Sequence, residues 1–318
     1  FESDEHERFK AEHSIAFREV FKDQPIVGQG VQLLAKKLNK NYPADTYKFQ
    51  LTVDVDDAWM YKHRGFFNSV LQLKLDFFTF KYKRFAERLK VLFGSKKDPW
   101  NTFEYIGETE KNLATPVRYF FLLSNKLWFD SKVNIRSTAL KNLIAGLWQK
   151  NKVGLHPSYL SNFSEKQLHK EFFRMTYMVE NKPQHSRQHY LKLKLPETYK
   201  RLIKLGVLED YSMGWASQTG FRTGCSRPVP FYDLLAEKET HLQLVPFMAM
   251  DRTLKDYLQL DKDAALEKTK ELIDRVKAVG GQFTLLWHND ALSNYGEWEG
   301  WRETFEAIIA YASENKKT

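Results

Sequence analysis

The sequence predicts an α/β fold built on a parallel sheet, with a barrel favoured over an open sheet. Short apolar strand patterns alternate with helical patterns over residues 50–313. Polar side chains also follow several of the predicted strands, and in a parallel barrel the carboxyl ends of the strands share one face. No glycine-rich dinucleotide or P-loop motif follows any strand, so these nucleotide-binding folds lack support.

The predicted elements come in a regular order. Residues 1–22 and 31–38 have helical apolar spacing, and residues 50–53 form a short buried strand. An aromatic and basic segment at 59–115 precedes a strong strand at 117–124. Further helices are expected at 136–151, 164–180, 197–205, 263–279 and 301–313, and further strands at 153–156, 207–213, 242–250 and 283–287.

These elements suggest two parts. Residues 1–47 are interpreted as an N-terminal helical extension and residues 48–318 as the barrel, with 59–115 as a long insertion after the first strand. Aromatic and basic side chains together can stack on bases or on sugar faces. We expect the insertion to shape a substrate groove, and the alternative is a pair of amphipathic helices packed on the barrel.

Charge and cysteine content narrow the partners. The net charge of +9 and pI of about 9.2 favour anionic partners. The basic residues are spread through helical stretches without a basic block, which favours a solvated surface over nucleic-acid binding. The single cysteine, Cys225, excludes an internal disulfide and a cysteine-rich zinc site. No apolar run is long enough to cross a bilayer, so we expect no stable membrane insertion.

The start of the chain suggests a longer natural protein. It begins at Phe1 without an initiator methionine or a signal-peptide pattern, which leaves room for a further N-terminal domain. A cytoplasmic location is slightly favoured over the cell envelope or the extracellular space for the same reason.

Acidic side chains at the end of the first strand are the leading site candidates. Asp54 and Asp56 lie two residues apart, so an extended chain places them on the same side. Two carboxylates this close repel each other unless a cation or a proton lies between them. The alternative is a solvated acidic turn. The other candidates, at or just after a strand or in the loop after a helix, are His156, Arg187, His189, Asp210 and His288.

The order of these residues carries a resemblance. The motifs are Asp54-x-Asp56 after a strand, Gly154-Leu155-His156-Pro157-Ser158-Tyr159, Ser186-Arg187-Gln188-His189-Tyr190 and Leu286-Trp287-His288. Over residues 48–290 this series resembles the polysaccharide deacetylases (NodB-homology carbohydrate esterases), in particular a divergent bacterial branch with a long excursion after the first motif. The resemblance implies a distorted (β/α) barrel that removes acetyl groups from glycans with one divalent metal, usually zinc.

The same resemblance implies roles for individual residues. Asp54 is expected to be the catalytic base, with Arg187 orienting it, and His288 the general acid. Asp210 is a candidate for the acidic residue that tunes His288. Asp56 and His156 are expected metal ligands, and His189 is a candidate for a third. Substrate contacts are expected from Trp59, Trp100, Tyr159, Arg222 and Trp287.

One departure from the family pattern concerns the metal. The second motif usually carries two histidines four residues apart, but Leu160 stands four residues after His156. A catalytic zinc site usually has three protein ligands. Either His189 supplies the missing ligand, or Ser158 or Tyr159 binds through oxygen, or metal binding is altered or lost.

Position in the loop favours His189. In an extended loop, residues two apart point the same way, so His189 can approach the cavity that Arg187 reaches. His185 is the rival ligand, but it precedes Arg187 and is expected to lie outside the site.

The leading hypothesis is therefore a metal-dependent hydrolase that removes acetyl groups from a glycan, with N-deacetylation favoured. The second hypothesis is a barrel that binds carbohydrate without turnover, because the change at Leu160 removed the metal. A third, an iron oxygenase using one Asp and two His, is not favoured by the strand order or by the motif around Arg187.

Overall fold

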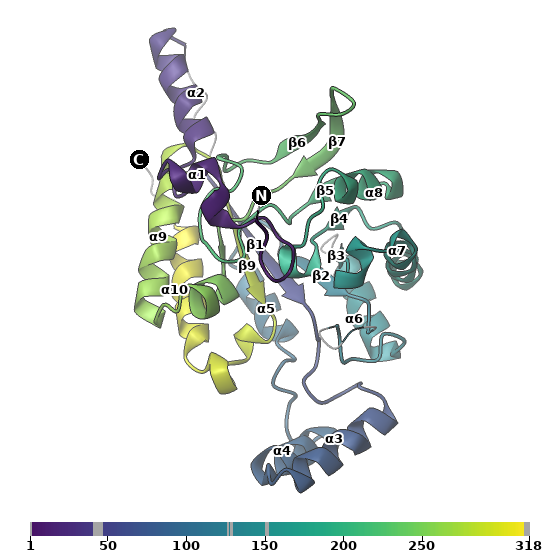
Figure 1. Ribbon diagram of the computed structural model, residues 1–318. Helices are drawn as coiled ribbons and strands as arrows, with labels where there is room; N and C mark the ends of the chain where they lie inside the picture. The colour runs from purple at the N-terminus through teal and green to yellow at the C-terminus, as the bar shows by residue number, and fades with distance from the viewer. Residues whose placement is uncertain (1, 41–46, 126, 128–129, 150–152, 315–318) are drawn as a thin grey trace.

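A curled sheet forms the centre of the molecule, shown in the computed structural model of Figure 1. The structure describes the whole chain except residues 1, 41–46, 126, 128–129, 150–152 and 315–318. The strands are β1 (Lys48–Val55), β2 (Arg118–Leu122), β3 (Val153–His156), β4 (His185–Ser186), β5 (Glu209–Asp210), β6 (Val229–Asp233), β7 (Lys238–Leu244), β8 (Ala249–Met250) and β9 (Gln282–His288).

The strand order confirms the predicted α/β fold class. The nine strands lie in the order β6-β7-β5-β4-β3-β2-β1-β9-β8. Neighbouring strands are parallel except for the antiparallel pair β6 and β7. The sheet is curled (Figure 1). Within the described residues β6 and β8 are its two edges and do not pair with each other, so it forms an open half-barrel.

Helices cover the outside of this half-barrel (Figure 1). None of the described helices is long and apolar enough to cross a membrane. The helices are α1 (Ile15–Arg18), α2 (Ile26–Lys37), α3 (Phe66–Phe78), α4 (Tyr82–Leu92), α5 (Phe103–Glu110), α6 (Thr138–Trp148), α7 (Glu165–Val179), α8 (Glu197–Leu205), α9 (Lys262–Ala278) and α10 (Trp301–Ser313).

Local signals in the sequence explain several helix ends. The Ser164 hydroxyl accepts a hydrogen bond from the Gln167 amide at 3.2 Å, the N-cap that the sequence predicts for α7. Asp261 caps α9 in the same way. Gly206 ends α8 with a φ of +85°, a conformation that residues with a side chain rarely adopt.

Alternation along β1 separates the core from the site. Leu51 and Val53 join the hydrophobic core beneath the helices, whereas Thr52 and Asp54 point into the curl of the sheet. This is the period of two that an extended chain imposes. The core therefore lies between sheet and helices, and polar side chains can occupy the concave face.

Several predicted boundaries were wrong. The described part of the range 1–22, residues 2–22, has the single-turn helix α1 and a short 3₁₀ turn as its only helical segments. The helix expected at 31–38 begins five residues earlier, after Pro25. The predicted strand at 207–213 is reduced to β5, and the one at 242–250 is divided between the end of β7 and β8. Strands β4 and β6 were missed. A two-residue strand has no periodicity, so only its neighbours in the sheet define it. The end of the helix predicted at 136–151 lies partly outside the described residues.

The insertion does not behave as one unit. Helices α3 and α4 form a hairpin that projects away from the half-barrel (Figure 1). Helix α5 instead packs on the body: Ile106 is fully buried, and the Tyr105 ring lies 6.4 Å from that of Phe305. The alternative of two amphipathic helices packed on the barrel is therefore wrong for α3 and α4.

Gly154 in β3 provides a test of packing inside the curl. A methyl group at this position would lie 2.6 Å from the Phe120 ring and 2.8 Å from the carbonyl oxygen of His185. We expect Gly154→Ala to lower the free energy of unfolding by about 1–3 kcal/mol, the usual cost of overpacking. Urea denaturation measures the change.

The matched control is Gly146→Ala in α6, where nothing lies within 4 Å of the added methyl group. That substitution should stabilise the protein by about 0.5–1 kcal/mol, because alanine is the better helix former. Equal effects of the two changes would contradict the packing described for β3.

Candidate active site and metal centre

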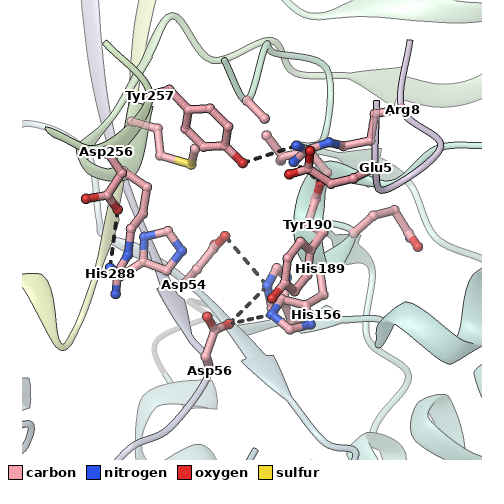
Figure 2. Close-up of a pocket in the computed structure, with 15 residues that line it drawn as sticks. Glu5, Arg8, Asp54, Asp56, His156, His189, Tyr190, Asp256, Tyr257 and His288 are labelled. Carbon is pink, nitrogen blue, oxygen red and sulfur yellow. Dashed lines mark hydrogen bonds and ion pairs between the residues drawn. The ribbon is translucent and has the colours of Figure 1, made fainter. Parts of the chain in front are cut away.

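The predicted site residues converge at the carboxyl ends of the parallel strands. Asp54 near the end of β1 is in register with His288, the last residue of β9. Figure 2 shows both carboxylates of the first motif and three histidines around one cavity. The cavity has a volume of about 480 Å³ and is lined by Glu5, Arg8, Asp54, Asp56, His156, Gln188, His189, Tyr190, Leu191, Ala216, Met250, Arg252, Asp256, Tyr257 and His288.

Arg187 holds Asp54 in place. Its Nη1 donates to Asp54 Oδ1 at 2.8 Å and its Nη2 to the Thr52 hydroxyl at 2.9 Å, while its Nε donates to the carbonyl of Tyr211. The guanidinium is fully buried, and it lies 4.7 Å from the centre of the Phe120 ring. Bonds in several directions leave the guanidinium little freedom, so the Asp54 carboxylate has a defined orientation.

Asp56 and two histidines form a compact set of donor atoms. Asp56 Oδ1 lies 3.3 Å from His156 Nε2 and 3.6 Å from His189 Nε2. Each of the three residues offers one ligand atom, and these atoms lie within 4.8 Å of one another. Burial opposes charge on Asp56, but His189 and His156 hold the pKa of its carboxyl well below the usual range.

The geometry of this set fits a divalent metal. Tetrahedral zinc with bonds of about 2.1 Å separates its ligand atoms by about 3.4 Å, close to the two distances from Asp56. His156 Nδ1 lies 2.5 Å from the carbonyl oxygen of Arg187, which turns Nε2 towards the carboxylates. A metal-binding histidine usually has its other ring nitrogen bonded to a carbonyl or carboxylate in this way. Asp56 Oδ1 is buried without a hydrogen-bond partner among the described residues.

The loop after β4 brings His189 to this place. The His189 amide donates to the carbonyl of Pro157 at 3.0 Å, which ties the loop to the segment that follows His156. The two imidazole rings lie 5.1 Å apart, centre to centre. Position 160, where the family pattern has a histidine, lies in the 3₁₀ turn Tyr159–Asn162.

The rival ligands lie elsewhere. The Ser158 hydroxyl donates to buried Glu171 at 2.5 Å, so it is engaged away from the metal centre. His185 Nε2 lies 3.3 Å from Glu209, and burial together with Arg118 lowers the pKa of His185 to about 3. His185 therefore has a separate environment, as expected from its place before Arg187.

His288 has an acidic partner that the sequence analysis missed. Its Nδ1 lies 2.8 Å from Asp251 Oδ1, and its amide donates to Asp251 Oδ2 at 2.7 Å. Burial lowers the pKa of the His288 ring, but Asp251 outweighs burial and raises it to about 10. Asp251 directly follows β8, so the search for polar residues after strands would have found it if extended past Met250.

The expected partner, Asp210, was therefore wrong. Its carboxylate accepts from the Ser186 hydroxyl at 2.8 Å and from the Ser212 amide and hydroxyl at 3.0 Å each. Asp210 thus joins the end of β4 to the loop after β5. It lies far from His288 in the sheet, because β5 is five places away from β9 in the strand order. The role that fits these bonds is support of the loop that carries Arg187.

The expected substrate contacts divide into two groups. Trp287 is fully buried and packs against Phe305 of α10, 5.2 Å between ring centres, so it cannot reach a substrate. Adjacent residues of a strand point to opposite faces, and His288 already faces the site. Trp59 is 7% exposed and belongs to the same core. Both expectations are corrected to core packing.

The remaining candidates lie outside the main cavity. None of the described residues in 59–115 lines it, so the expected groove-shaping role of the insertion, including Trp100, is wrong for this cavity. Trp100 is half-buried beside Arg64. Tyr159 contacts the Tyr190 ring at the rim, 5.6 Å between centres. Arg222 lines a second, adjoining cavity.

A segment at the amino end, residues 4–10, crosses the rim as a strap. Arg8 donates to the carbonyl of Tyr190 at 3.0 Å and to the hydroxyl of Tyr257 at 3.1 Å, and it pairs with Asp4 at 2.6 Å. Figure 2 shows Glu5 and Arg8 facing the cavity opposite Asp56. No local pattern singles out these residues, because only docking of the strap brings them to the site.

Comparison of the sequence with known proteins gives one partial family match. A family of unknown function (DUF7033) matches residues 1–43, a range that includes the strap. No curated protein matches the sequence.

Three solved structures align over most of the chain. The first is a putative polysaccharide deacetylase from Mycobacterium smegmatis, with a TM-score of 0.52, 15% identity and coverage of 85% of this chain and 86% of that one. A probable polysaccharide deacetylase from Pseudomonas aeruginosa PAO1 has a TM-score of 0.54, 11% identity and coverage of 89% and 92%. PuuE allantoinase has a TM-score of 0.54, 11% identity and coverage of 86% and 87%.

These similarities establish a deacetylase-like barrel fold. The fold is shared with a structure named for a different hydrolytic activity, so it does not decide the substrate. The arrangement of side chains at the strand ends has to carry any further conclusion.

The contact between Asp251 and His288 predicts a specific titration. In protein freed of metal by chelation, Asp251→Asn should lower the pKa of His288 from about 10, because the ring loses its largest counter-charge while burial continues to oppose protonation and only Asp56 and Asp54 remain to favour it. The elevated pKa stabilises the wild-type fold fully below pH 6.5, and this contribution is lost as the pH rises through about 10. NMR titration of the His288 ring measures the shift, and an unchanged pKa in the variant would contradict it.

Proposed function

We propose that this protein is a metal-dependent hydrolase that removes acetyl groups from a glycan, by N-deacetylation. One observation carries the proposal: the donor set of Asp56, His156 and His189 shares one cavity with a carboxylate held by an arginine and an imidazole held by a carboxylate. An acid and a base beside a metal site are what amide hydrolysis requires.

Asp56, His156 and His189 would hold the metal, which supplies Lewis acidity towards the acetyl carbonyl and lowers the pKa of water. Asp54 then serves as the general base. Its Oδ1 is engaged by Arg187, while its Oδ2 lies 3.7 Å from His156 Nε2, beside the donor set. A carboxylate oriented in this way can accept a proton from water there.

His288 is suited to the role of general acid. Because Nδ1 is bonded to Asp251, Nε2 remains to face the cavity and to donate a proton to the leaving amine. The raised pKa keeps the ring protonated at neutral pH. The acid and the base are in register on neighbouring strands, so both reach the same acetyl group.

The shape of the cleft favours an extended substrate. A second cavity of about 590 Å³ adjoins the first and shares Glu5, Arg8, Leu191, Ala216 and Tyr257 with it. Its wall also carries Phe9 and Trp215, and aromatic faces stack on sugar rings. Two adjoining cavities with polar and aromatic walls suit a chain of sugars better than a small cyclic amide.

Elemental analysis followed by acetate release from a panel of acetylated glycans tests the proposal. Close to one equivalent of divalent metal, with acetate release that chelation abolishes, is the expected result. Glycan binding without metal or acetate release would favour the alternative, a barrel that binds carbohydrate without turnover.

Asp54→Asn tests the base. Turnover should fall roughly 10²–10⁴-fold, the scale of a lost general base, while metal content is retained. Steady-state acetate release and metal stoichiometry on the same preparation separate the two effects. Acetate release close to the wild-type rate would refute the assignment.

His189→Ala tests the unusual ligand set. Loss of the His189 ligand should weaken zinc affinity at least tenfold. Asp56→Ala and His156→Ala should have the same effect, because each also removes one ligand. His185→Ala is the matched control, because this histidine lies in β4, four residues before His189, but pairs with Glu209. Competition with a chromophoric chelator gives the affinities. Equal affinity in His189→Ala and wild type would place the third ligand elsewhere.

A further inference from the structure

The helical hairpin of α3 and α4, residues 66–93, stands apart from the half-barrel and has no part in the site (Figure 1). Its interior contains a cluster of buried charges, and Val91 of α4 is fully buried as well. Asp76 is fully buried and receives hydrogen bonds from Arg84 Nε at 2.6 Å and Arg88 Nε at 2.7 Å. The Arg88 guanidinium also lies 4.7 Å from the centre of the Tyr61 ring. The two helices are thus joined through charges.

The exterior of the hairpin is apolar. Phe67 and Phe93 are 86% and 84% exposed, and Phe80, just after α3, is 77% exposed. Single exposed apolar side chains are ordinary, but a contiguous group marks an interaction surface. This inverted arrangement, with charges inside and large apolar groups outside, involves Phe66, Phe67, Leu71, Leu75, Phe77, Phe78, Phe80, Tyr82 and Phe93.

The surroundings of the hairpin are strongly basic. Residues 62–97 contain ten Lys and Arg against two Asp and Glu, which accounts for most of the net charge of +9 of the chain. Both acids are paired, Asp76 with the two arginines and Glu87 with Lys96. Lys74, Lys81, Lys83 and Lys90 are exposed beside the aromatic side chains.

We propose that the hairpin 66–93 docks on an anionic phospholipid surface. Aromatic side chains entering the interface between headgroups and acyl chains, with lysines directed to anionic headgroups, match the features of interfacial helices. Apolar residues lie on both helices and on the turn between them, whereas a groove in a partner protein would cover a single stripe. Helices of 13 and 11 residues are too short to span a bilayer, so the contact is peripheral.

This inference is independent of the proposed hydrolase activity. Co-sedimentation with phosphatidylcholine vesicles, with and without phosphatidylglycerol, tests it. Wild-type protein should bind the vesicles that contain phosphatidylglycerol and should bind pure phosphatidylcholine more weakly. Failure of the wild-type protein to bind the anionic vesicles overturns the proposal.

Two sets of substitutions separate the contribution of the apolar side chains to vesicle binding from that of the lysines. Phe67→Ser with Phe78→Ser and Phe80→Ser should reduce binding to anionic vesicles at least tenfold. Lys81→Glu with Lys83→Glu should remove the preference for phosphatidylglycerol. The control is Leu234→Ser with Leu235→Ser between β6 and β7, where the side chains are 75% and 79% exposed. Loss of binding in this control, or full binding by the triple phenylalanine variant, overturns the proposal.

A probe on the hairpin distinguishes insertion from indirect effects on folding. Cys225 is the single cysteine, so Phe67→Cys combined with Cys225→Ser gives one site for an environment-sensitive dye. Its emission should shift to the blue on addition of anionic vesicles, and no shift overturns the proposal. Light scattering measures the mass: a wild-type dimer that the triple phenylalanine variant splits, without vesicle binding, would assign the hairpin to an interface between copies instead.

Discussion

The buried ion pair between Arg187 and Asp54 is the contact on which the site depends. It joins the loop after β4 to β1 across the concave face, and the same guanidinium bonds Thr52 and the carbonyl of Tyr211. Removing one partner of a buried pair typically costs about 3–5 kcal/mol, because the other charge is left uncompensated. The curl of the sheet and the orientation of the Asp54 carboxylate are therefore coupled: a change that relaxes one disturbs the other.

The donor set of Asp56, His156 and His189 gives the proposed metal centre three ligands without a histidine at position 160. The donor set needs atoms separated by the distances that a small cation imposes, and it does not need a particular order along the chain. A backbone hydrogen bond from His189 to Pro157 brings a later loop against the second motif. In the proposed site His189 would thus supply the third ligand from the loop after β4, which lies beside the loop after β3 because β3 and β4 are neighbours in the sheet.

Two additions distinguish this chain from a plain half-barrel. The strap of residues 4–10 narrows the cleft and supplies Glu5 and Arg8 to it. The hairpin of α3 and α4 leaves the cleft untouched and presents apolar side chains outward. Both are attached to the curled sheet as surface elements, where new binding properties cost the core little.

The sequence by itself determined the α/β class, the strand ends that carry polar residues and the set of Asp54, Asp56, His156, Arg187, His189 and His288, because alternating patterns and motif order are local properties. The period of two along a strand would also have excluded Trp287 as a substrate contact, because it is adjacent to His288 and therefore points to the opposite face. Only the tertiary structure assigned Asp251 to His288, since β8 lies beside β9 while β5 does not. The position of the strap was likewise decided by contacts between segments distant in sequence. The inverted character of the hairpin depends on which helix faces remain uncovered, and no local pattern encodes either feature.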